Sequence, residues 1–148
     1  MRRESGFTLV ELLVVFSIMA LVVGLVPMAF QRMRDSAQYR DTLRSMMSEM
    51  RIARSQALAT RSETRFVVDL SRRSYGIAGS PEHALPESLA MRATVAGIEA
   101  QGQEAAIRFF PDGGATGGSV EIVRPSGTGA RLQVDWLSGR ITQEALLP

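Results

Sequence analysis

The hydrophobic positions of the N-terminal sixth of the chain form one nearly continuous apolar run. It extends from Phe7 to Val26 and is interrupted by a single carboxylate, Glu11, with Pro27 directly after it. Twenty helical residues rise about 30 Å, which is the thickness of the hydrocarbon core of a bilayer. A charged side chain in that core costs about 2.5–3.5 kcal/mol. The pattern therefore predicts a helix that can span a membrane, and a specific role for Glu11.

After Pro27 the pattern becomes amphipathic and predicts that the helix continues to about Thr60. Apolar residues recur at spacings of three and four, with two more widening the stripe: Tyr39, Leu43, Met46, Met50, Ala53 and Ala57, then Met47 and Leu58. We expect this stripe to pack against a sheet. The opposite face is expected to be solvated, and it carries Arg40, Asp41, Arg44, Glu49, Arg51 and Arg54.

From Thr64 onwards the hydrophobic period changes from that of a helix to that of strands. The segments TRFVVDL and SYGIAG predict a hairpin, and residues 80–105 predict a loop with one or two short strands near 89–95. Further strands are predicted at residues 106–110, 119–123, 131–136 and 140–142, joined by glycine-rich turns. The fold class is therefore α+β, a long helix that is first transmembrane and then amphipathic, followed by an antiparallel β-sheet or sandwich domain.

Two residues near the C-terminus are expected to determine this fold. Trp136 alternates with Val134 along the predicted strand and should bury a large ring. Gly139 should adopt a positive φ in the tight turn that follows.

The composition excludes some classes of function but does not indicate a binding partner. The chain has 148 residues, enough for one compact domain after the apolar run. All 17 basic residues are arginine and the net charge is only +2, with acidic residues interspersed, so the charge balance gives no nucleic-acid signature. With no cysteine, the chain has neither a disulfide nor a thiol nucleophile.

The candidate chemistry is weak. The loop Asp112–Gly118 is rich in glycine, but it lacks the Lys-Ser/Thr of a P-loop and leads into a strand. His83 is the only histidine and has no second His or Cys near it in sequence to build a zinc site, so we expect it to be solvated. No G-x-S-x-G nucleophile motif is present. We therefore predict no enzyme activity, no cofactor and no metal site.

The residues GFTLVELLVV at 6–15 resemble the class III signal of type IV pilins and type II secretion pseudopilins. The resemblance implies that a prepilin peptidase cuts between Gly6 and Phe7 and methylates the new amine on Phe7. It also implies that Glu11 pairs with the amine of a neighbouring subunit during assembly, which offsets the desolvation of both charges. Pro27 matches a helix-kinking proline. The alternative is a plain signal anchor in which Glu11 reaches the membrane interface.

This interpretation divides the chain into a leader, a helix and a β domain. Arg2 and Arg3 precede the apolar run, so the positive-inside rule places the N-terminus in the cytoplasm and the rest outside. The implied location is the bacterial inner membrane, crossed once, with the C-terminal domain in the periplasm. The predicted boundaries are 1–6 for the leader, 7–60 for the helix with 7–26 as its transmembrane and assembly segment, and 61–148 for the periplasmic β domain.

The segments IRFFPDGGATGG at 107–118 and VDWLSGRI at 134–141 resemble the GspH/FimT family, and are closer to its GspH branch. That branch implies a minor pseudopilin at or near the tip of the periplasmic pseudopilus, which helps a type II secretion system export folded proteins. The implied partners are the I, J and K minor pseudopilins, the major G pseudopilin, the prepilin peptidase and the inner membrane.

The alternative is a FimT-like minor type IV pilin that binds DNA for uptake. Its candidate DNA-binding residues are Arg124, Arg131 and Arg140, but Glu121 and Asp135 dilute their charge. A nucleic-acid partner is therefore not expected.

Overall fold

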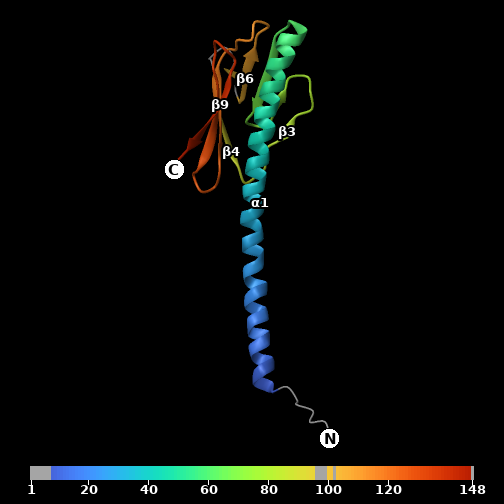
Figure 1. Ribbon diagram of the computed structural model, residues 1–148, viewed down its shortest axis with the longest axis vertical. Helices are drawn as coiled ribbons and strands as arrows, with labels where there is room; N and C mark the ends of the chain where they lie inside the picture. Colours follow the sequence, from blue (N-terminus) through green and yellow to red (C-terminus); the bar gives the residue numbers. More distant parts are fainter. Residues whose placement is uncertain (1–7, 96–99, 102, 148) are drawn as a thin grey trace. The chain divides into compact units, whose positions relative to one another are not determined.

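A single long helix precedes all the strands. The computed structural model describes residues 8–95, 100–101 and 103–147, without the side chains of 25–32 and 100–101. Helix α1 spans Leu9–Thr60 (Figure 1). The strands that follow are β1 (Thr64–Asp69), β2 (Ser74–Ile77), β3 (His83–Ala84), β4 (Ala90–Val95), β5 (Ala100–Gln101), β6 (Glu104–Phe109), β7 (Gly118–Val123), β8 (Gly129–Val134) and β9 (Ile141–Leu146).

The chain divides into two compact units, residues 1–37 and 38–148. The first unit contains the beginning of α1, which continues through Pro27 as helix. The kink expected at Pro27 stays a prediction. In the described part of the chain, no helix combines the length and the apolar character that crossing a bilayer requires. The predicted span at 7–26 is described only in part, since Phe7 lies outside the described residues and the side chains of 25–32 are not described.

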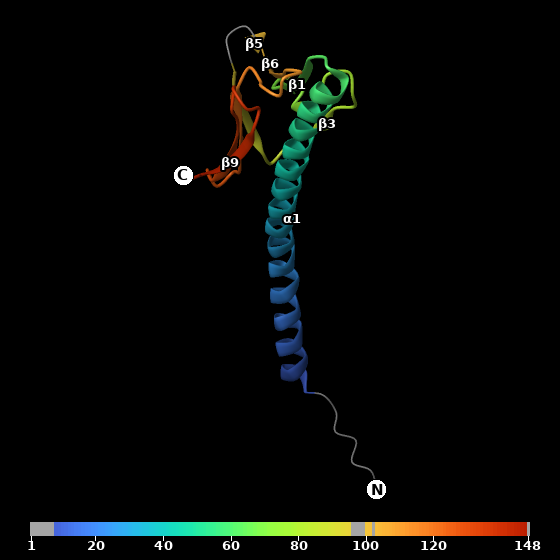
Figure 2. The same cartoon turned by 45° about the horizontal axis from the view of Figure 1, so that its top comes forward.

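The second unit combines the remainder of α1 with two antiparallel sheets. One sheet has the strand order β3-β2-β1-β6-β5 and the other β4-β7-β8-β9. Figure 2 shows β1 and β6 next to the C-terminal end of α1, with β9 in a separate layer. The predicted fold class, a long helix followed by antiparallel β structure, is confirmed. This unit includes residues 38–60 of the helix as well as the predicted β domain.

The helix stripe forms the centre of the core, as its spacing predicted. Tyr39, Leu43, Met46, Met50, Ala53 and Ala57 are all at most 6% exposed. They share one cluster with buried residues of both sheets, among them Phe66, Phe109 and Leu132. Hydrophobic burial is therefore what holds the helix and the two sheets together.

The strand predictions were accurate where side chains alternate between buried and exposed. The predicted hairpin is formed by β1 and β2 with Phe66 opposite Ile77. Strands β3 and β5, of two residues each, lie inside the predicted loop 80–105 and were missed because they are too short to carry a period. Strand β9 extends further than the predicted 140–142, since its exposed polar residues give little hydrophobic signal.

Four side chains depart from their predicted surroundings. Leu58 is 42% exposed and does not belong to the buried stripe. Glu49 and Arg54, assigned to a solvated face, are half-buried and bind residues of the β domain. The expectation that Trp136 is buried was wrong: β8 ends at Val134, and the Trp136 side chain is 67% exposed.

We predict that Met50→Ala lowers the free energy of unfolding of the second unit by about 2–5 kcal/mol, because it leaves a cavity among helix and sheets. Met50 is fully buried, whereas Met33 on the same helix is 66% exposed. Met33→Ala is the matched control and should change stability by no more than about 0.5 kcal/mol. Chemical denaturation of the two variants measures the difference. Equal losses would contradict the assignment of Met50 to the core.

Candidate assembly and interaction sites

The first candidate site is the beginning of α1. The predicted processing residues Gly6 and Phe7 lie outside the described residues. The backbone N–H of Glu11 donates to the hydroxyl of Thr8 at 3.3 Å, so Thr8 caps the helix. Thr8 and Glu11 have the spacing of a capping box, and a carboxylate in the first turn also interacts favourably with the helix dipole. The motif Thr-x-x-Glu is the sequence signal from which this cap could have been predicted.

The large apolar side chains on both sides of Glu11, from Leu9 to Val23, are exposed. Between 45% and 80% of each of these large side chains is exposed. They are Leu9, Val10, Leu12, Leu13, Val14, Val15, Phe16, Ile18, Met19, Leu21, Val22 and Val23. A continuous apolar surface of this extent is typical of a segment that contacts lipid or other helices.

The second candidate site is a junction in which Arg54 of α1 holds two loops of the β domain. Its Nε donates to the carbonyl of Gly113 at 3.2 Å, and its Nη2 donates to the carbonyl of Ser138 at 3.0 Å. Gly113 belongs to the loop between β6 and β7, and Ser138 to the turn between β8 and β9. One guanidinium therefore connects the helix to both glycine-rich segments.

Glycine is required where these loops meet. Gly139 has a φ of +59°, and a Cβ there would lie 2.3 Å from the carbonyl oxygen of Gly113 and 2.8 Å from Nε of Arg54. Gly113 has a φ of +91°, and a Cβ there would lie 3.3 Å from Nη2 of Arg54. The positive φ predicted for Gly139 is confirmed, and the close approach of the two loops explains why both segments contain glycine.

Asp135 fixes the turn that carries Gly139. Its Oδ1 accepts hydrogen bonds from the backbone N–H and the hydroxyl of Ser138, at 2.8 and 2.7 Å. The Ser138 hydroxyl bond in particular holds the pKa of Asp135 below its ordinary value. Because the chain turns here, Trp136 leaves the strand, and its carbonyl accepts from the N–H of Ala115 while its ring faces solvent.

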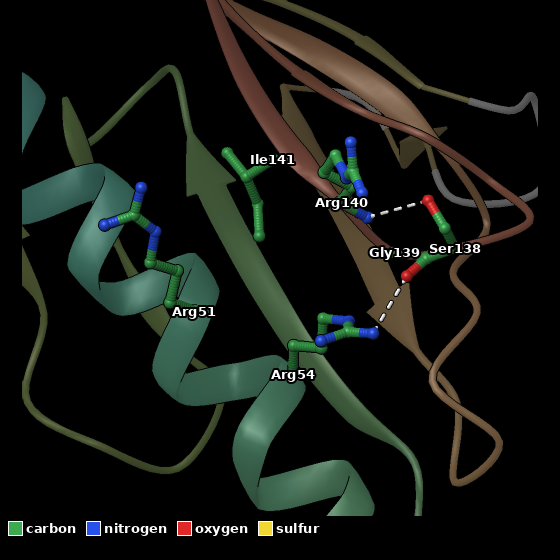
Figure 3. Close-up of a pocket in the computed structure, with 6 residues that line it drawn as sticks. All are labelled: Arg51, Arg54, Ser138, Gly139, Arg140 and Ile141. Carbon is green, nitrogen blue, oxygen red and sulfur yellow. Dashed lines mark hydrogen bonds between the residues drawn. The ribbon is translucent and has the colours of Figure 1, made fainter.

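A basic pocket lies beside this junction (Figure 3). Its volume is about 430 Å³. Figure 3 shows Arg54 of α1 reaching Ser138 in the β8–β9 turn, with Arg51 further along the same helix and Arg140 and Ile141 on the segment that leads into β9. The lining residues are Arg51, Arg54, Ser138, Gly139, Arg140 and Ile141.

In the glycine-rich loop between β6 and β7, backbone N–H groups donate hydrogen bonds to acceptors within the loop or at the end of β6. The N–H of Gly114 donates to Asp112 Oδ1, and the N–H groups of Gly113 and Thr116 donate to the carbonyls of Phe110 and Arg108. A phosphate-binding loop needs such donors to be free for its ligand. The loop is therefore built as a structural turn.

The three arginines of the DNA-binding alternative are not arranged as one stripe. Arg124 stacks over the ring of Tyr39, with 3.8 Å from its Cζ to the ring centroid. Arg131 donates to Glu121 Oε1 from both Nε and Nη2, at 2.9 and 2.7 Å. Arg140 lines the pocket with Arg51, which lies about 18 Å beyond Tyr39 along the helix axis. Only Arg140 of the three is exposed.

His83 is more engaged than the sequence predicted. Its Nε2 lies 3.2 Å from Glu49 Oε1 on α1, and its ring stacks on Tyr75 with 5.5 Å between centroids. Its side chain is still 46% exposed. This contact ties the short strand β3 to the helix.

The comparisons with known proteins agree with these features. Residues 1–27 match the family described as "Prokaryotic N-terminal methylation motif". Residues 42–139 match the family described as "Type II transport protein GspH", and these residues contain the helix stripe from Leu43 onwards, Arg54 and both glycine-rich segments. The chain belongs to the GspH family of type II transport proteins.

Individual relatives extend the comparison to nearly the whole chain. The type II secretion system protein H of Xanthomonas campestris pv. campestris is 30% identical over 141 residues, which are 95% of this chain and 83% of that protein. The structure of the minor pseudopilin EpsH from the type 2 secretion system of Vibrio cholerae has a TM-score of 0.58 at 12% identity. It covers 73% of this chain and 97% of EpsH, and at this identity it shows that the two share the GspH fold.

We predict that Gly139→Ala destabilises the second unit more than Gly79→Ala does. Both glycines have positive φ, but a Cβ at Gly79 meets nothing within 4 Å, whereas at Gly139 it collides with Gly113 and Arg54. Gly79→Ala should lower the free energy of unfolding by about 1–2 kcal/mol through backbone strain. Gly139→Ala should lower it further, because the added Cβ also displaces both loops. Thermal unfolding measures both, and equal losses would contradict the close approach at the junction.

Proposed function

We propose that this chain is a minor pseudopilin of a type II secretion system, a structural subunit without catalytic activity at or near the tip of the periplasmic pseudopilus. The observation that carries this proposal is the exposed apolar surface of α1 from Leu9 to Val23, which begins with Glu11 in a capped first turn. Such a surface needs a lipid or helical environment. The subunit then contributes to export by assembling with other subunits.

Before assembly, the apolar segment at 7–26 holds the subunit in the inner membrane, with the β domain in the periplasm. During processing, a prepilin peptidase removes residues 1–6 and methylates Phe7. The match of residues 1–27 to the N-terminal methylation motif supports the proposed methylation.

In the assembled pseudopilus, the new amine of Phe7 on one subunit is paired with Glu11 of another. Each of these charges is costly in an apolar bundle, and pairing offsets much of that cost. The pairing also fixes the register of adjacent helices. By resemblance, the neighbouring subunits are the I, J and K minor pseudopilins and the major G pseudopilin.

The DNA-uptake alternative receives no support from a specific observation. Arg131 is paired with Glu121 and Arg124 is stacked on Tyr39, so both cations already have partners within the subunit. A nucleic-acid site needs several cations free to contact successive phosphates.

Processing can be tested at Gly6. The mature protein should begin at a methylated Phe7, and Gly6→Leu should block cleavage because the peptidase motif requires a small residue before the apolar run. Intact-mass spectrometry of the membrane-extracted protein measures both. Gly24→Ala is the control, since Gly24 lies in the helix and a Cβ added there would meet nothing within 4 Å, and it should be cleaved normally. A mature N-terminus at Met1 or beyond Ala29 would rule out the pilin-like pathway.

Assembly can be tested at Glu11. Glu11→Gln removes the charge but retains a residue that a capping box accepts, so the helix should still start at Leu9. We expect normal cleavage and membrane insertion, but weaker crosslinking to neighbouring pseudopilins in vivo and reduced secretion. The penalty is about 3 kcal/mol if a partner's amine is left unpaired in an apolar site.

Glu87→Gln is the control for this experiment, because Glu87 is an exposed carboxylate in the loop before β4. It should crosslink and secrete like the wild type. If Glu11→Gln does so as well, Glu11 does not set the register of assembly.

A further inference from the structure

The pocket beside the Arg54 junction is lined by arginines, and the proposed assembly role does not explain why. Arg51, Arg54 and Arg140 line it, and no acidic side chain lines it among the described residues. Trp136 and Leu137 precede it in the β8–β9 turn and are 67% and 72% exposed. We call these five residues the Trp–Arg surface.

The three arginines of this surface differ in the hydrogen bonds that their side chains make within the subunit. Arg54 is fixed by its hydrogen bonds to Gly113 and Ser138. Within the described residues, no hydrogen bond or ion pair holds the guanidinium of Arg51. Arg140 bonds to Ser138 only through its backbone N–H, and its side-chain charge acts on the Asp135 carboxylate, which Ser138 already occupies. Two guanidinium groups therefore have donors to offer to an external anion.

The backbone of Trp136, in the apolar part of the surface, is held by contacts with the loop between β6 and β7. The Trp136 carbonyl accepts from Ala115, and the Trp136 Cβ lies close to Gly117, where an added Cβ would be only 3.1 Å away. Tryptophan and arginine are the residue types enriched at the energetic centre of protein interfaces, and exposed Trp136 lies four positions before Arg140 in the chain. Little conformational entropy would be lost when a partner covers Trp136.

We propose that the Trp–Arg surface binds an acidic segment of another protein, in which a Glu or Asp carboxylate enters the pocket and a neighbouring apolar side chain packs on Trp136 and Leu137. Guanidinium groups pair with carboxylates through paired N–H donors. A pocket of about 430 Å³ holds a side chain and its neighbours. The proposal does not depend on which assembly the subunit serves.

A protein carboxylate fits these observations better than a nucleic acid does. A nucleic-acid strand presents a phosphate with every nucleotide and is bound by a groove of cations that tracks the backbone. Here the available cations, Arg51 and Arg140, line one pocket. Arg124 and Arg131, which would have to extend a groove, are engaged by Tyr39 and Glu121.

The test uses the full chain in detergent micelles, with peptides that are blocked at both ends. The probe is a fluorescein-labelled Ser-Glu-Leu-Glu-Ser peptide, and its partner has Gln in place of each Glu. Trp136 is the only tryptophan, so its intrinsic fluorescence reports on this surface alone. We expect the Glu peptide to change Trp136 fluorescence saturably and the Gln peptide to have little effect.

Variants then assign the contacts by the anisotropy of the labelled peptide. Arg51→Gln and Arg140→Gln should each weaken binding about fivefold, as expected for one partly exposed ion pair. Trp136→Ala should weaken it by a similar factor. Arg44→Gln is the matched control, since it is exposed on the same helix about 10 Å before Arg51, and it should leave binding unchanged. Arg54 is left intact because it holds the loops.

Three results would overturn the proposal. The first is equal binding of the Glu and Gln peptides, or Glu-peptide binding that the Arg51 and Arg140 variants do not weaken. The second is an oligothymidylate that changes Trp136 fluorescence more strongly than the Glu peptide and loses this effect in Arg140→Gln, which would assign the surface to nucleic acid. The third is a Trp136 signal that depends on protein concentration without peptide, with dimers in sedimentation, which would assign it to a second copy of this chain.

Discussion

The structure of the second unit depends on the burial of one helix stripe. Tyr39, Leu43, Met46, Met50, Ala53 and Ala57 contribute to a core that also receives residues from both sheets. Neither sheet has another helix in the described chain to cover it, so the same stripe must serve both. This explains the choice of methionine at two fully buried positions, because an unbranched, flexible side chain can fill the irregular space between layers of different orientation.

Polar contacts at the edges of this core set the positions of the loops. Arg54 connects α1 to the loops at Gly113 and Ser138, and Glu49 connects it to β3 through His83. Arg124 covers Tyr39 near the start of the stripe. The helix is therefore held by apolar contacts along its centre and by cations and carboxylates on both sides. The glycines at 113 and 139 allow the loops to come close enough for the Arg54 bonds to form.

The two candidate sites depend on the sequence in different ways. The processing and assembly site is a local motif, so Gly6, Phe7 and Glu11 could be proposed from consecutive residues. The Trp–Arg surface combines Arg51 with Trp136 and Arg140, which are more than eighty positions apart in the chain. Nothing in either segment indicates that they meet. From the sequence, Arg51 was expected on a solvated face and Trp136 in the core, and Arg140 was a candidate only for DNA binding.

The amino-acid sequence by itself determined the long helix, its buried stripe, the β1–β2 hairpin and the α+β class, because periods of 3.6 and 2 residues are local consequences of which side chains must leave water. Its N-terminal and glycine-rich motifs also pointed to the family. The tertiary structure alone decided that Arg54 and Glu49 leave the solvated face, that Trp136 turns outward, and that Arg51 and Arg140 share a pocket. These outcomes depend on Asp135 ending β8 in a turn and on two distant loops meeting at one guanidinium, and contacts between residues so far apart leave no periodic trace in the chain.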